Sequence, residues 1–152
     1  MGMRVTCRQS AARSGGELLS FDFWMRGGAT PSPMHVHPHQ EERITVVSGS
    51  VRFRSGAADR VLSPGDTLVS PPGESHTVGP AGNEDVVMVA ELRPALTYEQ
   101  FMERSFALDR ADYAKALQQA MAFDVFILEY PGYGDRSGAP DALARIVRIA
   151  ER

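Results

Sequence analysis

Cysteine and lysine are almost absent from this chain of 152 residues, which contains one cysteine, Cys7, and one lysine, Lys115. A single cysteine excludes an internal disulfide and any zinc cluster built from cysteine ligands. A metal ion bound by this chain must therefore be held by histidine and carboxylate side chains.

The sequence also lacks a strong net charge and a long hydrophobic run. Its formal net charge is −3 and its arginines are scattered, so we predict no phosphate-binding surface and no nucleic-acid partner. No stretch approaches the roughly 18 apolar residues of a membrane span, and no apolar run lies among the first twenty residues. We therefore expect a soluble, cytoplasmic protein that folds as one domain over residues 1–152 and binds no membrane.

Short alternating segments separated by turn residues are typical of the first two thirds of the chain. From Leu18 to Met25 apolar and polar residues alternate, which predicts a half-buried strand. Valine-rich runs follow, separated by turns such as residues 63–66, where Pro64 and Gly65 favour a type II turn. This punctuation predicts an all-β barrel or sandwich of antiparallel strands over residues 18–93.

The pattern changes at Pro94 from strands to helical periodicity, and we expect the barrel to end there. A first helix is predicted just after Thr97, and two more are predicted to begin near Asp109 and Asp141. The apolar run 123–130 fits a helix or a strand equally well. The fold class predicted is thus a β-barrel followed by about three C-terminal α-helices over residues 94–152, packed on the barrel or on a second subunit.

Three histidines and two acids lie together in residues 35–42. On a strand His35 and His37 point to the same side, so two imidazoles can converge on one point. Glu42 would point away from His37 if the strand ran straight, so the chain must bend between them, and Pro38 supplies the bend. Beyond it, Glu42 lies on the same, inward-facing side of the next strand as that strand's apolar residues. A turn-forming segment delivers a third imidazole, His76, to the start of another strand.

A buried carboxylate needs a compensating partner, because an isolated buried charge costs several kcal/mol. A divalent transition metal bound by His35, His37, Glu42 and His76 provides that partner. Three imidazoles and one carboxylate suit Fe, Mn, Ni, Cu, Co or Zn, with positions left open for water or substrate.

Two spaced motifs resemble those of the cupin family. The first contains His35-x-His37, four residues, Glu42, six residues and Gly49; the second contains Gly65, Pro71, Gly73 and His76 at the family spacing, with Pro80 at the asparagine position. The resemblance implies a double-stranded β-helix, or jelly-roll, barrel that holds a metal ion through His35, His37, Glu42 and His76.

The family's reactions are diverse, so the fold does not choose a function. We expect a metal-dependent enzyme acting on a small organic molecule, as a dioxygenase or as a Lewis-acid isomerase or cyclase. The alternative is a non-catalytic module that binds a small ligand or serves regulation. Glu42 and His39 are the candidates for a catalytic role, and His39 and Glu41 are otherwise read as exposed loop residues.

Five apolar residues of the predicted strands line either a substrate pocket or the core, and the core is the expected place: Phe23, Met25, Phe53, Leu68 and Met88. We also expect a homodimer. The segment from Leu18 to Met25 is able to add to a partner's sheet, and the strip of Phe101, Met102 and Phe106 offers further apolar surface. The alternative is that the helices cover their own barrel. Cys7 is expected to be inert.

Overall fold

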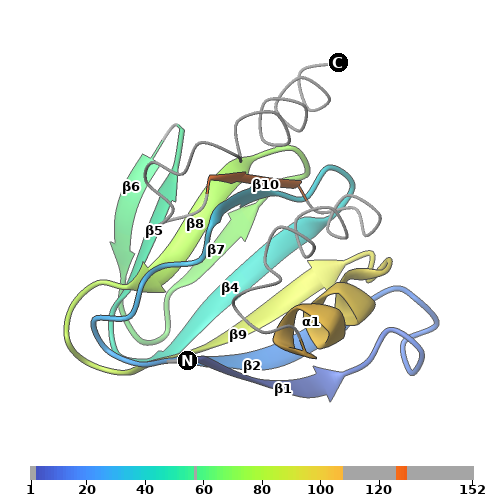
Figure 1. Cartoon of the computed structure of the whole chain (residues 1–152), viewed down its shortest axis with the longest axis horizontal. Helices are drawn as coiled ribbons and strands as arrows, with labels where there is room; N and C mark the ends of the chain where they lie inside the picture. The colour runs from blue at the N-terminus through green and yellow to red at the C-terminus, as the bar shows by residue number, and fades with distance from the viewer. Residues whose placement is uncertain (1–2, 57, 108–125, 130–152) are drawn as a thin grey trace.

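Two antiparallel sheets of five strands each face one another in this computed structural model, which describes residues 3–56, 58–107 and 126–129 (Figure 1). The first sheet has the order β1 (Met3–Gln9), β2 (Leu19–Met25), β9 (Val86–Arg93), β4 (Glu41–Ser48) and β7 (Thr67–Ser70). The second has the order β10 (Phe126–Glu129), β3 (Met34–Val36), β8 (Ser75–Pro80), β5 (Val51–Ser55) and β6 (Ala58–Leu62). The predicted all-β architecture is confirmed.

The main hydrophobic core lies between the two sheets. Strand β4 shows the expected alternation, with Glu42, Ile44 and Val46 buried and their neighbours more exposed. Of the five apolar residues that sequence left between pocket and core, four are buried in this cluster and Phe23 packs against it half-buried. They are therefore core residues, as expected.

The turn between β6 and β7 has the predicted type II form. Gly65 takes a φ of 92°, a left-handed value that glycine adopts without a Cβ clash, and the Asp66 amide donates to the Ser63 carbonyl over 2.9 Å. This tight turn returns the chain antiparallel to β4, with Glu42 opposite Ser70.

Helix α1 (Tyr98–Ala107) packs against the sheet of β1, β2 and β9 (Figure 1). Its contacts form a second hydrophobic cluster of Leu19, Phe21, Ala90, Leu92, Ala95, Tyr98 and Phe101. The predicted start of the first helix after Thr97 is confirmed, whereas the helices predicted from Asp109 and Asp141 lie outside the described residues. No helix in the described part of the chain is long and apolar enough to cross a bilayer.

Two strands lie outside the range 18–93 that was predicted for the barrel. Strand β1 precedes the predicted start at Leu18, and because most of its residues are exposed or half-buried, its hydrophobic pattern is weak. It pairs with β2, which also pairs with β9, so the expectation that residues 18–25 join a partner's sheet is wrong: both edges of β2 are occupied.

The other strand outside this range is β10, in the run that the sequence left open between helix and strand. Residues 126–129 pair with β3, which resolves the ambiguous run 123–130 as a strand over its described part. The expectation that strands end at Pro94 is therefore wrong. Pairing with a distant strand stabilises this short segment, and local sequence does not report such pairing.

Candidate metal centre

Four polar side chains from both sheets meet in the interior. His35 lies on β3, His37 directly follows β3, Glu42 lies on β4 and His76 on β8. One ligating atom from each lies within 4.8 Å of those of the others, and all four residues are buried. The structure therefore brings together all four predicted metal ligands.

Strand pairing and a bend place these side chains. His35 is directly opposite His76 in the β3–β8 pair, so both point to the same face, and their ring centroids are 4.5 Å apart. His37 was expected on the strand but lies one residue beyond it, where the chain bends through Pro38 and His39. Its ring centroid is still only 5.0 Å from that of His35.

The loop before β8 is fastened to the loop after β3. The amide of Gly73, whose φ is 85°, donates to the His37 carbonyl over 2.9 Å. A side chain at that φ is strained, so the Pro-Pro-Gly segment makes a turn that joins two ligand-bearing loops. The positions of His37 and His76 are therefore coupled through the backbone.

Glu42 and His76 form the shortest polar contact of the cluster. The Nε2 atom of His76 lies 2.6 Å from the Glu42 carboxylate. Burial opposes charge on Glu42, but this hydrogen bond and the three neighbouring imidazoles lower its pKa to about 2. Burial likewise opposes protonation of His76, yet the hydrogen bond to Glu42 and its negative charge raise the pKa of His76 above its ordinary value.

His35 and His37 are held in the neutral form. Burial, reinforced by the neighbouring His76 and His37, lowers the pKa of His35 to about 3. Burial is also the main reason why the pKa of His37 is lowered. Neutral imidazoles offer a lone pair to a metal ion, so these two residues are prepared for ligation near neutral pH.

The donor set fits a divalent transition metal. Neither ring nitrogen of the buried His37 has a hydrogen-bond partner among the described residues, which is unusual for a polar group in an interior. Its Nε2 atom lies 3.6 Å from the Glu42 carboxylate, so a cation between them would satisfy both groups. Three imidazoles with one carboxylate match Fe, Mn, Ni, Cu, Co or Zn.

Aromatic side chains and one amide surround the cluster. The ring of Tyr98 lies 5.1 Å from that of His37, and Phe53 stacks on His76 at 5.4 Å. Gln40 is fully buried and donates to the carbonyls of Pro94 and Ala95 over 2.9 and 2.8 Å. Gln40 and Tyr98 were not among the site residues predicted from the sequence. The position of Gln40 between two ligands was the available signal for it, while Tyr98 is brought in by tertiary packing.

The two loop candidates for catalysis lie farther out. His39 is exposed in the bend after β3, which confirms the expectation of an exposed loop residue. The same expectation is wrong for Glu41, which is half-buried and is the first residue of β4. Glu42, the other catalytic candidate, belongs to the cluster itself. Of these three residues, the geometry places only Glu42 among the predicted metal ligands.

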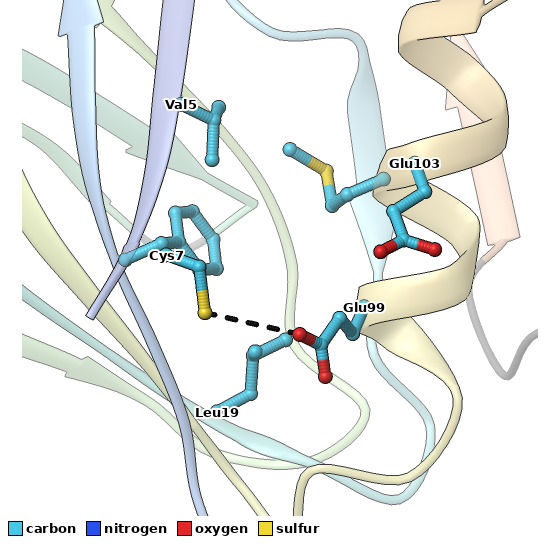
Figure 2. Close-up of a pocket in the computed structure, with 7 residues that line it drawn as sticks. Val5, Cys7, Leu19, Glu99 and Glu103 are labelled. Atoms are coloured by element: carbon cyan, nitrogen blue, oxygen red, sulfur yellow. Dashed lines mark hydrogen bonds between the residues drawn. The ribbon is translucent and has the colours of Figure 1, made fainter. Parts of the chain in front are cut away.

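A cavity of about 260 Å³ lies beneath α1, apart from the four ligands. Its walls come from β1, β2 and α1: Val5, Cys7, Leu19, Phe21, Glu99, Met102 and Glu103. Figure 2 shows the Cys7 thiol directed at the Glu99 carboxylate, at 3.8 Å. Partial burial and the Glu99 charge raise the pKa of Cys7, which agrees with the expectation of an inert thiol.

The fold is that of a cupin-type β-barrel, and its interior buries a cluster of three histidines and one glutamate. Residues 23–90 match the family model of the cupin domain. This segment contains both predicted motifs and all four residues of the cluster. No curated protein sequence matches the chain significantly.

Solved structures with the same fold include three from bacteria. A conserved protein with a double-stranded β-helix domain from Klebsiella pneumoniae is 21% identical, with a TM-score of 0.53 over 61% of this chain and 77% of that one. A predicted oxalate decarboxylase from Thermotoga maritima is 20% identical, with a TM-score of 0.57 over 60% and 80%. A sugar phosphate isomerase from Silicibacter pomeroyi is 18% identical, with a TM-score of 0.53 over 60% and 59%. They show the double-stranded β-helix fold.

Proposed function

We propose that the protein is a metal-dependent enzyme that acts on a small organic molecule, with dioxygenase chemistry ahead of isomerase or cyclase chemistry. The observation that carries the proposal is the convergence of three buried imidazoles and one buried carboxylate on one point. A set of four protein ligands leaves positions for a substrate in an octahedral or five-coordinate site. A purely structural barrel has no need to bury the charge of Glu42.

The chain's own residues have separable roles in this proposal. His35 and His37 present neutral imidazoles because burial disfavours their charged forms. Glu42 balances the charge of a cation, and its hydrogen bond to His76 keeps one carboxylate oxygen in a fixed direction. A bound divalent metal would supply Lewis-acid polarisation of a substrate oxygen, or redox chemistry with dioxygen where the metal is redox-active.

Glu42 and His39 remain the proposed groups for proton transfer. The Nε2 atom of His76 lies 2.6 Å from the Glu42 carboxylate, so a proton between them can move without a large displacement. His39 lies at the exposed bend between two ligand-bearing elements, where it can meet a substrate that approaches from solvent.

The test begins with the metal content of protein purified without added metal, followed by oxygen uptake with phenolic and diketone compounds. Small oxygen-rich acids and sugar phosphates join the panel, because two neighbours in fold are named as a predicted oxalate decarboxylase and a sugar phosphate isomerase. Turnover that depends on a stoichiometric metal supports the proposal. Stoichiometric metal without turnover of any compound favours the alternative below.

The alternative is a non-catalytic module that binds a small ligand, and one observation favours it. Tyr98 packs its ring against His37, and the three histidines are at most 8% exposed. A covered cluster suits a metal that stabilises the barrel, while the cavity beneath α1 holds the ligand. Equal thermal stabilisation by redox-inactive Zn²⁺ and redox-active Fe²⁺, with no turnover, would support this alternative.

We further propose a homodimer in the cytoplasm. The free thiol of Cys7 is compatible with a reducing compartment. Strand β1 is an edge of its sheet, and unpaired backbone groups on an edge strand are a template for a second chain. Light scattering at micromolar concentration tests this proposal: a monomer overturns it. A dimer that Val5→Pro converts to a monomer without loss of metal assigns the interface to β1.

A further inference from the structure

Gln40 is a fully buried amide that joins the metal centre to the turn after β9. Both protons of its Nε2 atom are used, since this atom donates to the Pro94 carbonyl over 2.9 Å and to the Ala95 carbonyl over 2.8 Å. The rotated amide would place Oε1 against these two carbonyl oxygens, and such an arrangement is repulsive. The orientation of the amide is therefore fixed, and Oε1 points away from the turn.

The Oε1 atom of Gln40 is left without a hydrogen-bond partner among the described residues, although it is buried. Such an acceptor is costly unless a donor lies close to it. Among the described residues two other buried side chains have donors without a partner, His37 and Ser70, and of these His37 lies three residues before Gln40 in the same bend before β4. The side chains of His37 and Gln40 are both almost completely buried there.

The other two histidines show what His37 lacks. The Nδ1 atom of His35 lies 2.7 Å from the Pro33 carbonyl, and the Nδ1 atom of His76 lies 3.0 Å from the Glu74 carbonyl. In both cases a backbone oxygen two residues earlier holds a proton on Nδ1 and leaves Nε2 facing the cluster. The residue two positions before His37 is His35, on β3, and its carbonyl forms no such hydrogen bond with the His37 ring.

We propose that Gln40 is a positioning residue, whose Oε1 atom accepts the Nδ1 proton of His37 and thereby keeps the His37 Nε2 lone pair directed at the metal centre. This inference deepens the proposed function, on whose metal centre it rests. It assigns to one amide the task that backbone carbonyls perform for His35 and His76. A side chain that orients a ligand in this way is a common part of metal sites.

The alternative tautomer has a specific cause. The Nε2 atom of His37 lies 3.6 Å from the Glu42 carboxylate, whose negative charge attracts a proton to that nitrogen. Without the acceptor on Gln40, the metal-free protein would carry the His37 proton on Nε2. A metal ion would then have to displace this proton, so the loss of Gln40 weakens binding even when all four ligands are present.

Gln40 also connects the site to its cover. Gln40 holds the turn at Pro94 and Ala95, which leads directly into α1. The ring of Tyr98, on α1, lies against the ring of His37. Displacement of this turn therefore acts on the orientation of His37 through one side chain. The metal centre is thereby linked to the cavity beneath α1. Phe21 lines that cavity and stacks on Tyr98, with the ring centroids 6.2 Å apart.

The experiment compares the full-length protein with Gln40→Leu, Gln40→Glu and a matched surface control, Gln100→Leu. Gln100 is exposed on α1. Two quantities are measured for each protein: the ¹⁵N chemical shifts of the His37 ring without metal, which report the tautomer, and the affinity for Co²⁺ from its visible absorption. Gln40→Leu removes donor and acceptor, whereas Gln40→Glu keeps an oxygen for the Nδ1 proton and loses the two N–H donors.

We expect the Nδ1–H tautomer of His37 in the parent protein, in Gln40→Glu and in Gln100→Leu, and the Nε2–H tautomer in Gln40→Leu. Affinity for Co²⁺ is expected to fall about 10- to 100-fold in Gln40→Leu and to be largely restored in Gln40→Glu. A purely structural role as a tie to the turn predicts equal losses in both variants, with no change of tautomer, and that result overturns the proposal.

The Nε2–H tautomer in the parent protein also overturns it, and this measurement needs no variant, so poor folding of Gln40→Leu leaves the proposal testable. The result is distinguishable from failure of the proposed function. If the parent protein bound no Co²⁺ but showed the tautomer change, the metal centre would be wrong and the Gln40 contact right. If the parent protein bound Co²⁺ but Gln40→Leu showed no tautomer change, the metal centre would be right and the Gln40 contact wrong.

Discussion

The metal centre and the cavity beneath α1 are neighbouring regions built in opposite ways. At the centre, buried polar groups from β3, β4 and β8 lie within 4.8 Å of one another. At the cavity, apolar side chains from β1, β2 and α1 leave about 260 Å³ unfilled, and two carboxylates lie on its wall. Regular strand pairing thus holds the four polar side chains in defined positions, whereas the packing of α1 across the sheet leaves a cavity between the helix and the sheet. The stack of Phe21 on Tyr98 and the contact of Tyr98 with His37 connect the two regions.

The largest expected effect is the loss of metal in His37→Ala. Removal of one of four ligands should reduce metal content from one ion per chain to nearly none, and should lower the unfolding temperature because a bound ion stabilises the native state. Elemental analysis and thermal unfolding are the measurements. His39→Ala is the matched control, since His39 is exposed and should leave metal content unchanged. Full occupancy in His37→Ala would show that the ligand set is wrong.

The second effect separates tight from loose packing. Leu92 is fully buried between the two regions, and Leu92→Ala should cost about 2 to 5 kcal/mol of unfolding free energy. Met102 is only partly buried at the cavity, so Met102→Ala should cost less than about 2 kcal/mol, because little additional space is created. Denaturant unfolding of the metal-free proteins measures both values. Equal losses would mean that the cavity is filled in solution.

The third effect is a fall in stability of the metal-free protein as the pH drops. His35 has its pKa lowered to about 3 in the folded state, against about 6.5 in the unfolded chain, so the unfolded state binds the extra proton between these values. Its contribution is complete above pH 6.5 and is lost as the pH falls toward 3, at up to about 1.4 kcal/mol per pH unit. His37 shifts in the same direction.

Two other groups shape the same profile. Glu42 adds a loss only below its ordinary value of 4.5, as the pH falls toward its folded pKa of about 2. His76 has a raised pKa, so its contribution is present below the unfolded value and is lost as the pH rises through the folded value. Urea unfolding from pH 4 to 8 measures the slope. His35→Gln should flatten it, and a flat profile in the parent protein would contradict the assignment.

The smallest effect is expected at the cavity wall. Cys7→Ser should change the free energy of unfolding by less than about 0.5 kcal/mol, because Cys7 is exposed and its contact with Glu99 is long. Its raised pKa also means that a thiol reagent at pH 7 should react more slowly with Cys7 than with a free cysteine peptide. A faster reaction would show that the cavity activates the thiol.

The same contrast explains which parts of the fold and of the metal centre could be predicted from the sequence. The ligands His35, His37 and Glu42 lie within eight residues of one another, and strand parity with one bend determines which side they face. His76 follows a turn whose proline and glycine residues are informative on their own. Local chemistry was sufficient for these four residues and for most of the core.

Contacts between distant segments were not predictable in this way. Strand β1 has no continuous buried face, β10 is defined by its pairing with β3, and Tyr98 reaches His37 only because α1 folds back over the sheet. In the sequence Gln40 resembles an ordinary polar loop residue, and only the structure shows that it donates hydrogen bonds to Pro94 and Ala95. Each depends on tertiary packing, which overrides local propensity.

The pairing of β10 with β3 also sets an order for assembly. Strand β3, which carries His35, has only three residues and is held by β8 on one side and by β10 on the other. During synthesis residues 126–129 leave the ribosome about ninety residues after β3, so the strand that bears the first ligand keeps an open edge until late. The nascent barrel therefore exposes the backbone beside His35 to solvent, chaperones and free metal before β10 pairs with it.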